Sequence, residues 1–179
     1  AGYDTLRLAL AKKAILVEGD SDELVVQRAY MDAKGGRLPI QDGIDVISVG
    51  TAFLRFLELA LALKIPAAVV TDNDGDTAAV QKKYAAFDGQ PSIRICFDPD
   101  VDTGGLTVKE KPFNYNTLEP KILKANGREA LNKMLGTAAK TDDELHLHMR
   151  ANKTDCALAI FSSKTAITYP DYITRAIAP

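Results

Sequence analysis

The feature that most constrains this chain is an alternation of apolar strand segments with helical segments, in which two strands end in acidic clusters. The run AILV at residues 14–17 leads into EGDSD at residues 18–22, and AAVVT at residues 67–71 leads into DNDGD at residues 72–76. A wholly apolar strand is typical of a parallel sheet that is covered on both faces. Carboxyl ends of parallel strands meet at one sheet edge, so we expect the two clusters to form one site.

The periodicity extends this pattern to a whole α/β domain of residues 1–179. Strands are predicted at residues 14–18, 44–49, 67–71 and 92–97. Helices are predicted at residues 3–12, 21–34, 52–64, 77–87, 153–162 and 171–178. Ser21 is the expected N-cap of the helix that follows the first acidic cluster. Residues 98–117 predict a loop with one short strand near residues 106–110, and residues 118–150 predict a small helical insertion.

Composition limits the functional classes. No apolar run approaches 18 residues and no signal peptide is present, so we expect a cytoplasmic protein with no membrane partner. Cys96 and Cys156 lie in apolar contexts and are predicted to be buried thiols. The net charge of −2 provides no overall attraction to nucleic acid, although basic residues concentrate at residues 107–153. The chain begins with Ala1, which suggests a piece cut from a longer protein.

The acidic clusters are best explained by hard divalent cations. Several carboxylates buried together without a cation are costly, and oxygen-binding cations remove that cost. A βα turn with helix-capping acids remains the alternative. An EF-hand is disfavoured, because the glycine of DNDGD is at the fourth position and a strand precedes the loop. His146 and His148 are predicted to be solvated, which leaves no zinc ligand set.

These motifs resemble those of one known family. An E-G pair after one strand and a D-x-D after a later strand resemble the Toprim domain, and LVEGDSDELVVQRAY resembles the E-G-x-S-D motif of OLD (overcoming lysogenization defect) nucleases. The segments NTLEP at residues 116–120 and NKTDCALAIF at residues 152–161 resemble later OLD motifs. The resemblance implies a Toprim, Rossmann-like parallel sheet flanked by helices.

The resemblance also implies a function. OLD proteins join an N-terminal ABC-type ATPase to a C-terminal Toprim nuclease, and this chain has no G-x-x-x-x-G-K-[ST] loop. It therefore looks like the nuclease half alone, with DNA as its partner and two Mg²⁺ or Mn²⁺ ions as cofactors. A homodimer would make cleavage of both strands easiest.

Residue roles follow from matching the motifs. Glu18 and Asp22 would hold one metal, and Asp72 would bridge both. The second metal would take Asp74 and Glu119, with Asp76 assisting through water. Ser21 or Thr71 could add an oxygen ligand, whereas Asp20 is expected to face solvent or to contact a metal-bound water.

Two further positions complete the expected site. Lys153 is expected to stabilise charge on the reacting phosphate, with Lys164 as the alternative and a solvated surface lysine as the competing interpretation of either. At Gly19, a Cβ is expected to obstruct the turn or crowd the metal and phosphate. The catalytic set is thus Glu18, Asp72 and Lys153.

Two other functional classes share part of this pattern. A response-regulator receiver domain normally has an adjacent acidic pair after its first strand, unlike E-G-x-S-D here. A non-catalytic Toprim module of the recombination-mediator type would bind DNA without cutting it. Such a scaffold has no need of the five acids Glu18, Asp22, Asp72, Asp74 and Glu119.

Overall fold

The computed structural model describes residues 2–179 and contains a four-stranded parallel sheet with the strand order β2-β1-β3-β4. The strands are β1 (Lys13–Val17), β2 (Ile44–Ser48), β3 (Ala67–Val70) and β4 (Ile93–Cys96). All four predicted strands are present, and each ends one residue before its predicted carboxyl end. The predicted α/β class, with a parallel sheet flanked by helices, is confirmed.

Alternate residues of the central strand feed two separate cores, which explains its continuous apolar sequence. Ala14 and Leu16 pack on one face of the sheet with residues such as Phe53 and Leu57. Ile15 and Val17 pack on the opposite face. All four of these β1 side chains are fully buried.

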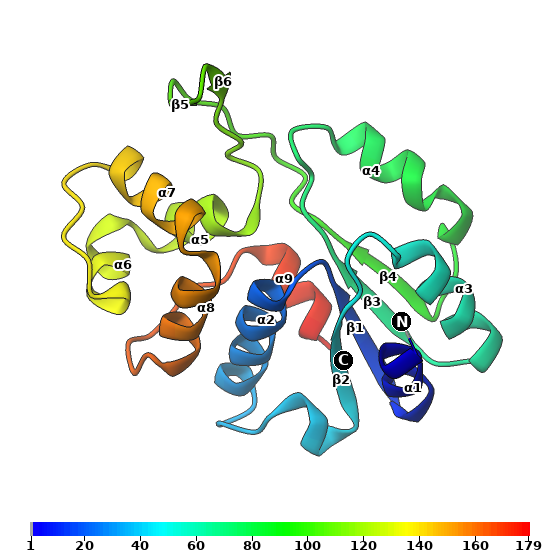
Figure 1. Cartoon of the computed structure of the whole chain (residues 1–179). Helices are drawn as coiled ribbons and strands as arrows, with labels where there is room; N and C mark the ends of the chain where they lie inside the picture. Colours follow the sequence, from blue (N-terminus) through cyan, green and yellow to red (C-terminus); the bar gives the residue numbers. More distant parts are fainter. Residues whose placement is uncertain (1) are drawn as a thin grey trace.

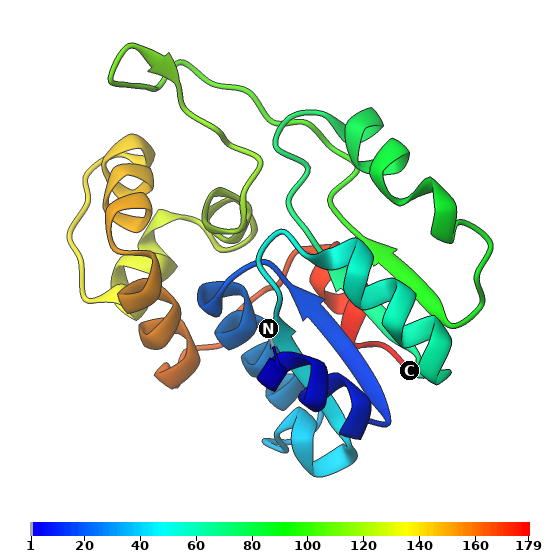
Figure 2. The ribbon, with the colours of Figure 1, turned by 45° about the vertical axis from the view of Figure 1, so that its right-hand side comes forward.

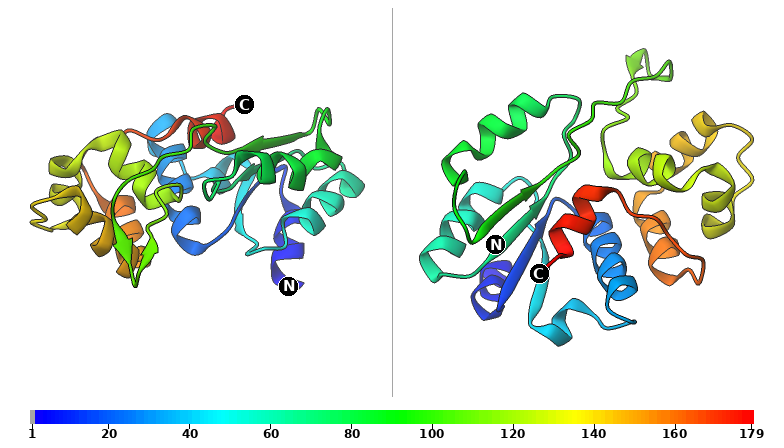
Figure 3. Two further views of the ribbon diagram at one scale, coloured as in Figure 1. Left: turned by 90° about the horizontal axis from the view of Figure 1, so that it is seen from above. Right: turned by 180° about the vertical axis from the view of Figure 1, so that it is seen from behind.

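Helices cover both faces of the sheet. One face carries α1 (Gly2–Leu10), α3 (Phe53–Leu63) and α4 (Thr77–Tyr84). The other carries α2 (Asp20–Ala33) and α9 (Asp171–Ile177), and Figure 2 shows α1 and α3 in front of the sheet with α9 behind it. In Figure 3, the view from behind shows α9 and α2 side by side over the strands. Every helix within residues 2–179 is too short or too polar to span a membrane.

A second group of helices lies beside α2. It consists of α5 (Leu118–Asn126), α6 (Arg128–Leu135), α7 (Asp142–Ala151) and α8 (Lys153–Ser162), with a hairpin of β5 (Thr107–Val108) and β6 (Lys111–Pro112) projecting above it (Figure 1). Arg28 of α2 joins the two groups, because its guanidinium donates to the carbonyls of Ile160, Phe161 and Ser163 at the end of α8.

Three local expectations need correction. The second helix begins at Asp20 with Gly19 as its N-cap, not with Ser21, because the Asp22 carboxylate accepts the Gly19 N–H at 2.9 Å. The short strand expected near residues 106–110 is a two-stranded hairpin. His146 is buried rather than solvated, since its ring packs against Phe113 and Tyr115 at 5.1 and 5.3 Å between centroids. The expectation of buried free thiols at the two cysteines is confirmed.

Candidate metal centre

The five acids expected to bind metal come together at the carboxyl edge of the sheet. Glu18 follows β1, Asp72 and Asp74 follow β3, Asp22 lies in the first turn of α2, and Glu119 lies in the first turn of α5. Glu18, Asp72 and Asp74 line one pocket, and each of the other four acids raises the pKa of Asp72. One negative site is therefore formed by the ends of β1 and β3 together with a helix that begins more than forty residues after β3.

Burial and like charges together perturb two of these carboxylates strongly. Burial is the larger cause, and with repulsion from the neighbouring acids it raises the pKa of Asp72 to about 8. Burial raises the pKa of Asp22 to about 6. The hydrogen bond from the Gly19 N–H lowers this pKa, and repulsion from Glu119 and Glu18 offsets part of that lowering. This arrangement of acids is therefore unfavourable in its fully ionised form unless a cation balances the charge.

Asp22 also has the capping role that the alternative interpretation assigned to it. Its Oδ2 atom accepts the Gly19 N–H, so one carboxylate oxygen stabilises the start of α2. The second oxygen is not needed for this cap. Capping and metal binding are thus compatible at Asp22.

A Cβ at Gly19 would not obstruct the turn within this chain, contrary to the steric expectation for this position. Its backbone is extended, with φ −138°, and a Cβ built there would approach Asp22 Oδ2 at 3.5 Å, an ordinary contact. Any requirement for glycine would have to come from a bound substrate or ion.

The turn at residues 72–76 is held by amide side chains. Asp74 has φ 49° and Gly75 has φ 84°, two left-handed residues in succession that Asp and Gly tolerate. Asn73 Oδ1 accepts the Gly75 N–H at 2.8 Å, and Asn114 Nδ2 donates to Asp74 Oδ1 at 2.8 Å. Asp76 is the N-cap of α4 and accepts the Ala79 N–H at 2.9 Å, so one of its oxygens already has a structural role.

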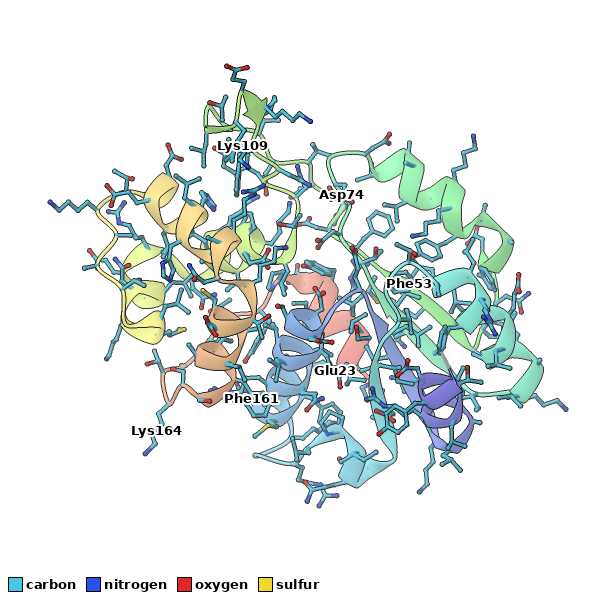
Figure 4. All side chains as sticks on the ribbon, viewed as in Figure 1. Glu23, Phe53, Asp74, Lys109, Phe161 and Lys164 are labelled. Carbon is cyan, nitrogen blue, oxygen red and sulfur yellow. The ribbon has the colours of Figure 1, made fainter. Side chains whose placement is uncertain are left out.

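Lys153 is the lysine that lies beside the acids. Its ammonium is 3.2 Å from Glu119 Oε1, and although partial burial lowers its pKa, Glu119, Asp72 and Asp22 raise it overall. Lys164 is exposed and points away at the opposite end from Asp74 (Figure 4). The geometry therefore associates Lys153, and not Lys164, with the cluster.

The remaining candidates have weaker links to the cluster. Asp20 is exposed, as expected. Thr71 is buried, and its hydroxyl donates to the Asp72 carbonyl at 3.4 Å. Ser21 is half-buried at the first turn of α2.

Sequence reasoning missed the residues that hold the site together. Lys121 is buried on α5 and makes salt bridges with Asp98 at 2.8 Å and Asp102 at 2.7 Å. Asn73 donates to the carbonyls of Asp98 and Asp100, so the loop at residues 98–102 connects the acidic turn to α5. Asn73 lies within the DNDGD motif and could have been noticed, but nothing local distinguishes Lys121 from an exposed lysine.

The donor set fits a hard divalent cation by its chemistry. All the converging ligands are carboxylate oxygens, which Mg²⁺ and Mn²⁺ prefer, and the raised pKa values indicate uncompensated negative charge. Within residues 2–179, however, no three His, Cys, Asp or Glu side chains converge closely enough to hold an ion as they stand. Binding therefore requires side-chain rotation, for which the exposed Glu18 is available, whereas Asp74 would have to give up the hydrogen bond from Asn114.

Comparisons with known proteins agree with a Toprim-type fold. A family model described as "Overcoming lysogenization defect protein-like, TOPRIM domain" matches residues 10–74, which include the first four of the five acids in chain order. The C-terminal region of the Xanthomonas campestris pv. campestris OLD protein has a TM-score of 0.59 at 25% identity, covering 96% of this chain and 92% of that one.

A second solved structure extends the likeness in fold. The C-terminal region of the Burkholderia pseudomallei OLD protein has a TM-score of 0.62 at 20% identity, covering 94% of this chain and 96% of that one. No curated protein matches the chain by sequence.

Proposed function

We propose, from the match of residues 10–74 to an OLD-like Toprim family model, that this chain is a metal-dependent DNA endonuclease that hydrolyses phosphodiester bonds with two divalent ions. The observation that carries the proposal is the convergence of five acids and one lysine at the carboxyl edge of the sheet. A non-catalytic DNA-binding module would gain nothing from raising the pKa of Asp72 to about 8, since the burial and the repulsion behind that shift weaken the fold.

The chain's own residues divide the work in this proposal. Glu18 and Asp22 would hold one ion and Asp74 and Glu119 the other. Asp72 would serve both ions, and Asp76 would contribute through water. Two ions bound there would neutralise the scissile phosphate and lower the pKa of the attacking water. Lys153 approaches from α8 and stabilises the charge that develops on the phosphate oxygens.

The similar solved structures support a proposal about the full-length protein. The similar structures are C-terminal regions of OLD proteins, so those full proteins contain an N-terminal portion. For this chain we propose an N-terminal ABC-type ATPase as its covalent partner, DNA as its substrate, a cytoplasmic location and a homodimer for cutting both strands. We further propose that residues 118–150 form an insertion within a Toprim domain of residues 1–179.

Plasmid cleavage tests the proposal directly. Supercoiled DNA incubated with the protein and Mg²⁺, Mn²⁺ or Ca²⁺ should be nicked and linearised with at least one of these ions, and EDTA should stop the reaction. Asp72→Ala should abolish cutting, whereas Asp20→Ala, two positions from Asp22 and exposed, should leave it unchanged. Cutting that survives EDTA, or an active Asp72→Ala variant, contradicts the two-ion mechanism. DNA binding without cutting under all three ions supports the non-catalytic module instead.

A further inference from the structure

A pocket of about 280 Å³ opens beside the acidic cluster, on the side away from Lys153. Its acidic wall is shared with the candidate metal centre and contains Glu18, Asp72 and Asp74. Its other wall comes from the turn after β2 and from α4, and includes Gly50, Thr51, Lys83 and Tyr84. None of the roles proposed above uses this second wall.

Lys83 is held at the pocket by aromatic rings instead of by an acid. Its ammonium is 5.1 Å from the centroids of both Phe53 and Tyr84, within the range of cation–π attraction. The two rings meet edge to face at 6.2 Å and 84°. Within residues 2–179, no carboxylate lies within ion-pair distance of Lys83, so its charge is positioned but unpaired.

The floor of the pocket contains a polar group without a partner. Tyr84 is 3% exposed, and its buried hydroxyl has no hydrogen-bond partner of good geometry among the described residues, since the hydroxyl of the nearby Thr71 donates to the Asp72 carbonyl. Buried hydroxyls in folded proteins nearly always have a partner. An unsatisfied hydroxyl beneath a positioned cation is the kind of group that a bound polar ligand or its water satisfies.

The positions of the two lysines define a path across the site. Lys153 contacts the cluster from α8 and Lys83 borders it from α4, which covers the opposite face of the sheet. For a polyanion whose reacting group lies at the acids, Lys83 is the cation that the shared pocket offers to the neighbouring anionic group. In DNA, that neighbouring group is the next phosphate along the same strand.

We propose that this pocket is a phosphodiester subsite, in which Lys83 binds the phosphate next to the scissile one and Tyr84 closes the floor. The inference rests on the proposed nuclease function, because it takes the acids as the reaction centre. The ligand class is a single strand of DNA backbone, since one unpaired ammonium in a pocket of this size suits one phosphate and its sugar.

The chain contains a matched control for Lys83. Lys82 is the preceding residue of α4, is also exposed and carries the same charge, but it does not line this pocket. Lys83→Met and Lys82→Met therefore change net charge identically. Lys83→Arg retains a cation that can stack on both rings.

Kinetics on a short DNA with a mapped cut position form the first test. Lys83→Met should raise KM about tenfold and leave kcat within about twofold, and it should lower the salt slope of binding by about one. Lys82→Met should match the wild type, and Lys83→Arg should restore most of the loss. If Lys83→Met behaves like Lys82→Met, the subsite is wrong even though cutting persists.

An uncharged linkage identifies the phosphate. A methylphosphonate placed next to the cut position, on one side or the other, should weaken the wild type as much as Lys83→Met does and should weaken Lys83→Met no further. Additive losses on both sides contradict the assignment. If the wild type does not cut DNA at all, anisotropy with a labelled single strand still decides the matter: selective loss of affinity in Lys83→Met upholds the subsite while the nuclease proposal fails.

Discussion

Replacing Lys121 with methionine removes the cation from the buried network that connects the acidic turn to α5. The Lys121 side chain is 2% exposed, and its ammonium lies 2.8 Å from Asp98 Oδ2, 2.7 Å from Asp102 Oδ2 and 2.9 Å from the Asp100 carbonyl. Methionine has a similar length and keeps the apolar packing of the stem. The variant therefore isolates the loss of charge and hydrogen bonds.

The expected cost follows from the burial of the partners. Breaking a fully buried ion pair by removing one member costs about 3–5 kcal/mol. The Asp98 and Asp102 side chains are 20% and 26% exposed, so water compensates part of that loss and we expect about 2–3 kcal/mol of unfolding free energy.

Lys124 provides the control on the same carboxylate. Its ammonium is 2.6 Å from Asp102 Oδ1, but its side chain is 57% exposed. Lys124→Met should therefore cost only about 0–1 kcal/mol, as exposed pairs do. The two variants differ in the burial of the lost cation and in how many acceptors it serves.

Urea denaturation followed by far-UV circular dichroism measures both changes, since the chain has no tryptophan. Burial opposes ionisation of Asp102, but hydrogen bonds from Lys121 and Lys124 hold its pKa below the ordinary value. The stabilisation from this depressed pKa is present at neutral pH and is lost as pH falls through the folded-state value, so the difference between variants should shrink in strong acid. Equal costs for the two variants at pH 7 would refute the reasoning from burial.

Two further predictions concern the site and its loop. Because burial and repulsion raise the pKa of Asp72 to about 8, the folded state holds more protons than the unfolded state between about pH 4 and 8, and stability in EDTA should fall as pH rises through that window. Asp72→Asn should flatten this fall of stability with pH and should raise the urea midpoint at pH 8. Mn²⁺ should stabilise the wild type but not this variant. A steeper fall of stability in the variant would contradict the repulsion at Asp72. Gly104→Ala places a methyl group against the ring of Tyr115 and should cost about 1–3 kcal/mol, whereas Gly105→Ala meets nothing within 4 Å and should stay within about 0.5 kcal/mol in the same assay.

Much of the fold could be predicted because its signals are local. A strand such as β3 is apolar along its whole length, and its two faces meet different cores, so periodicity alone indicates a central parallel strand. The helix α8 begins and ends where its pattern predicts, at Lys153 and Ser162. The first residue of a helix is harder to predict. Ser21 and Asp22 are both acceptable capping residues, and the choice between them depends on the backbone geometry at Gly19.

The buried histidine shows where local reasoning fails. His146 lies on a helix that contains many polar residues, and this composition predicts exposure for it. Its burial comes instead from Phe113 and Tyr115, which reach it from a loop thirty residues earlier. A helical pattern contains no information about which distant segment will cover it.

The sequence by itself determined the parallel α/β fold and which strand ends carry acids, since both depend on the order of residues along a short stretch of chain. Only the tertiary structure decided which lysines lie near the acidic edge of the sheet. Lys153 contacts Glu119, Lys121 is buried among the loop acids, and Lys83 packs against two aromatic rings. The physical reason is that a lysine's role depends on burial and on partners brought together by packing. Those partners come from segments far apart in the chain.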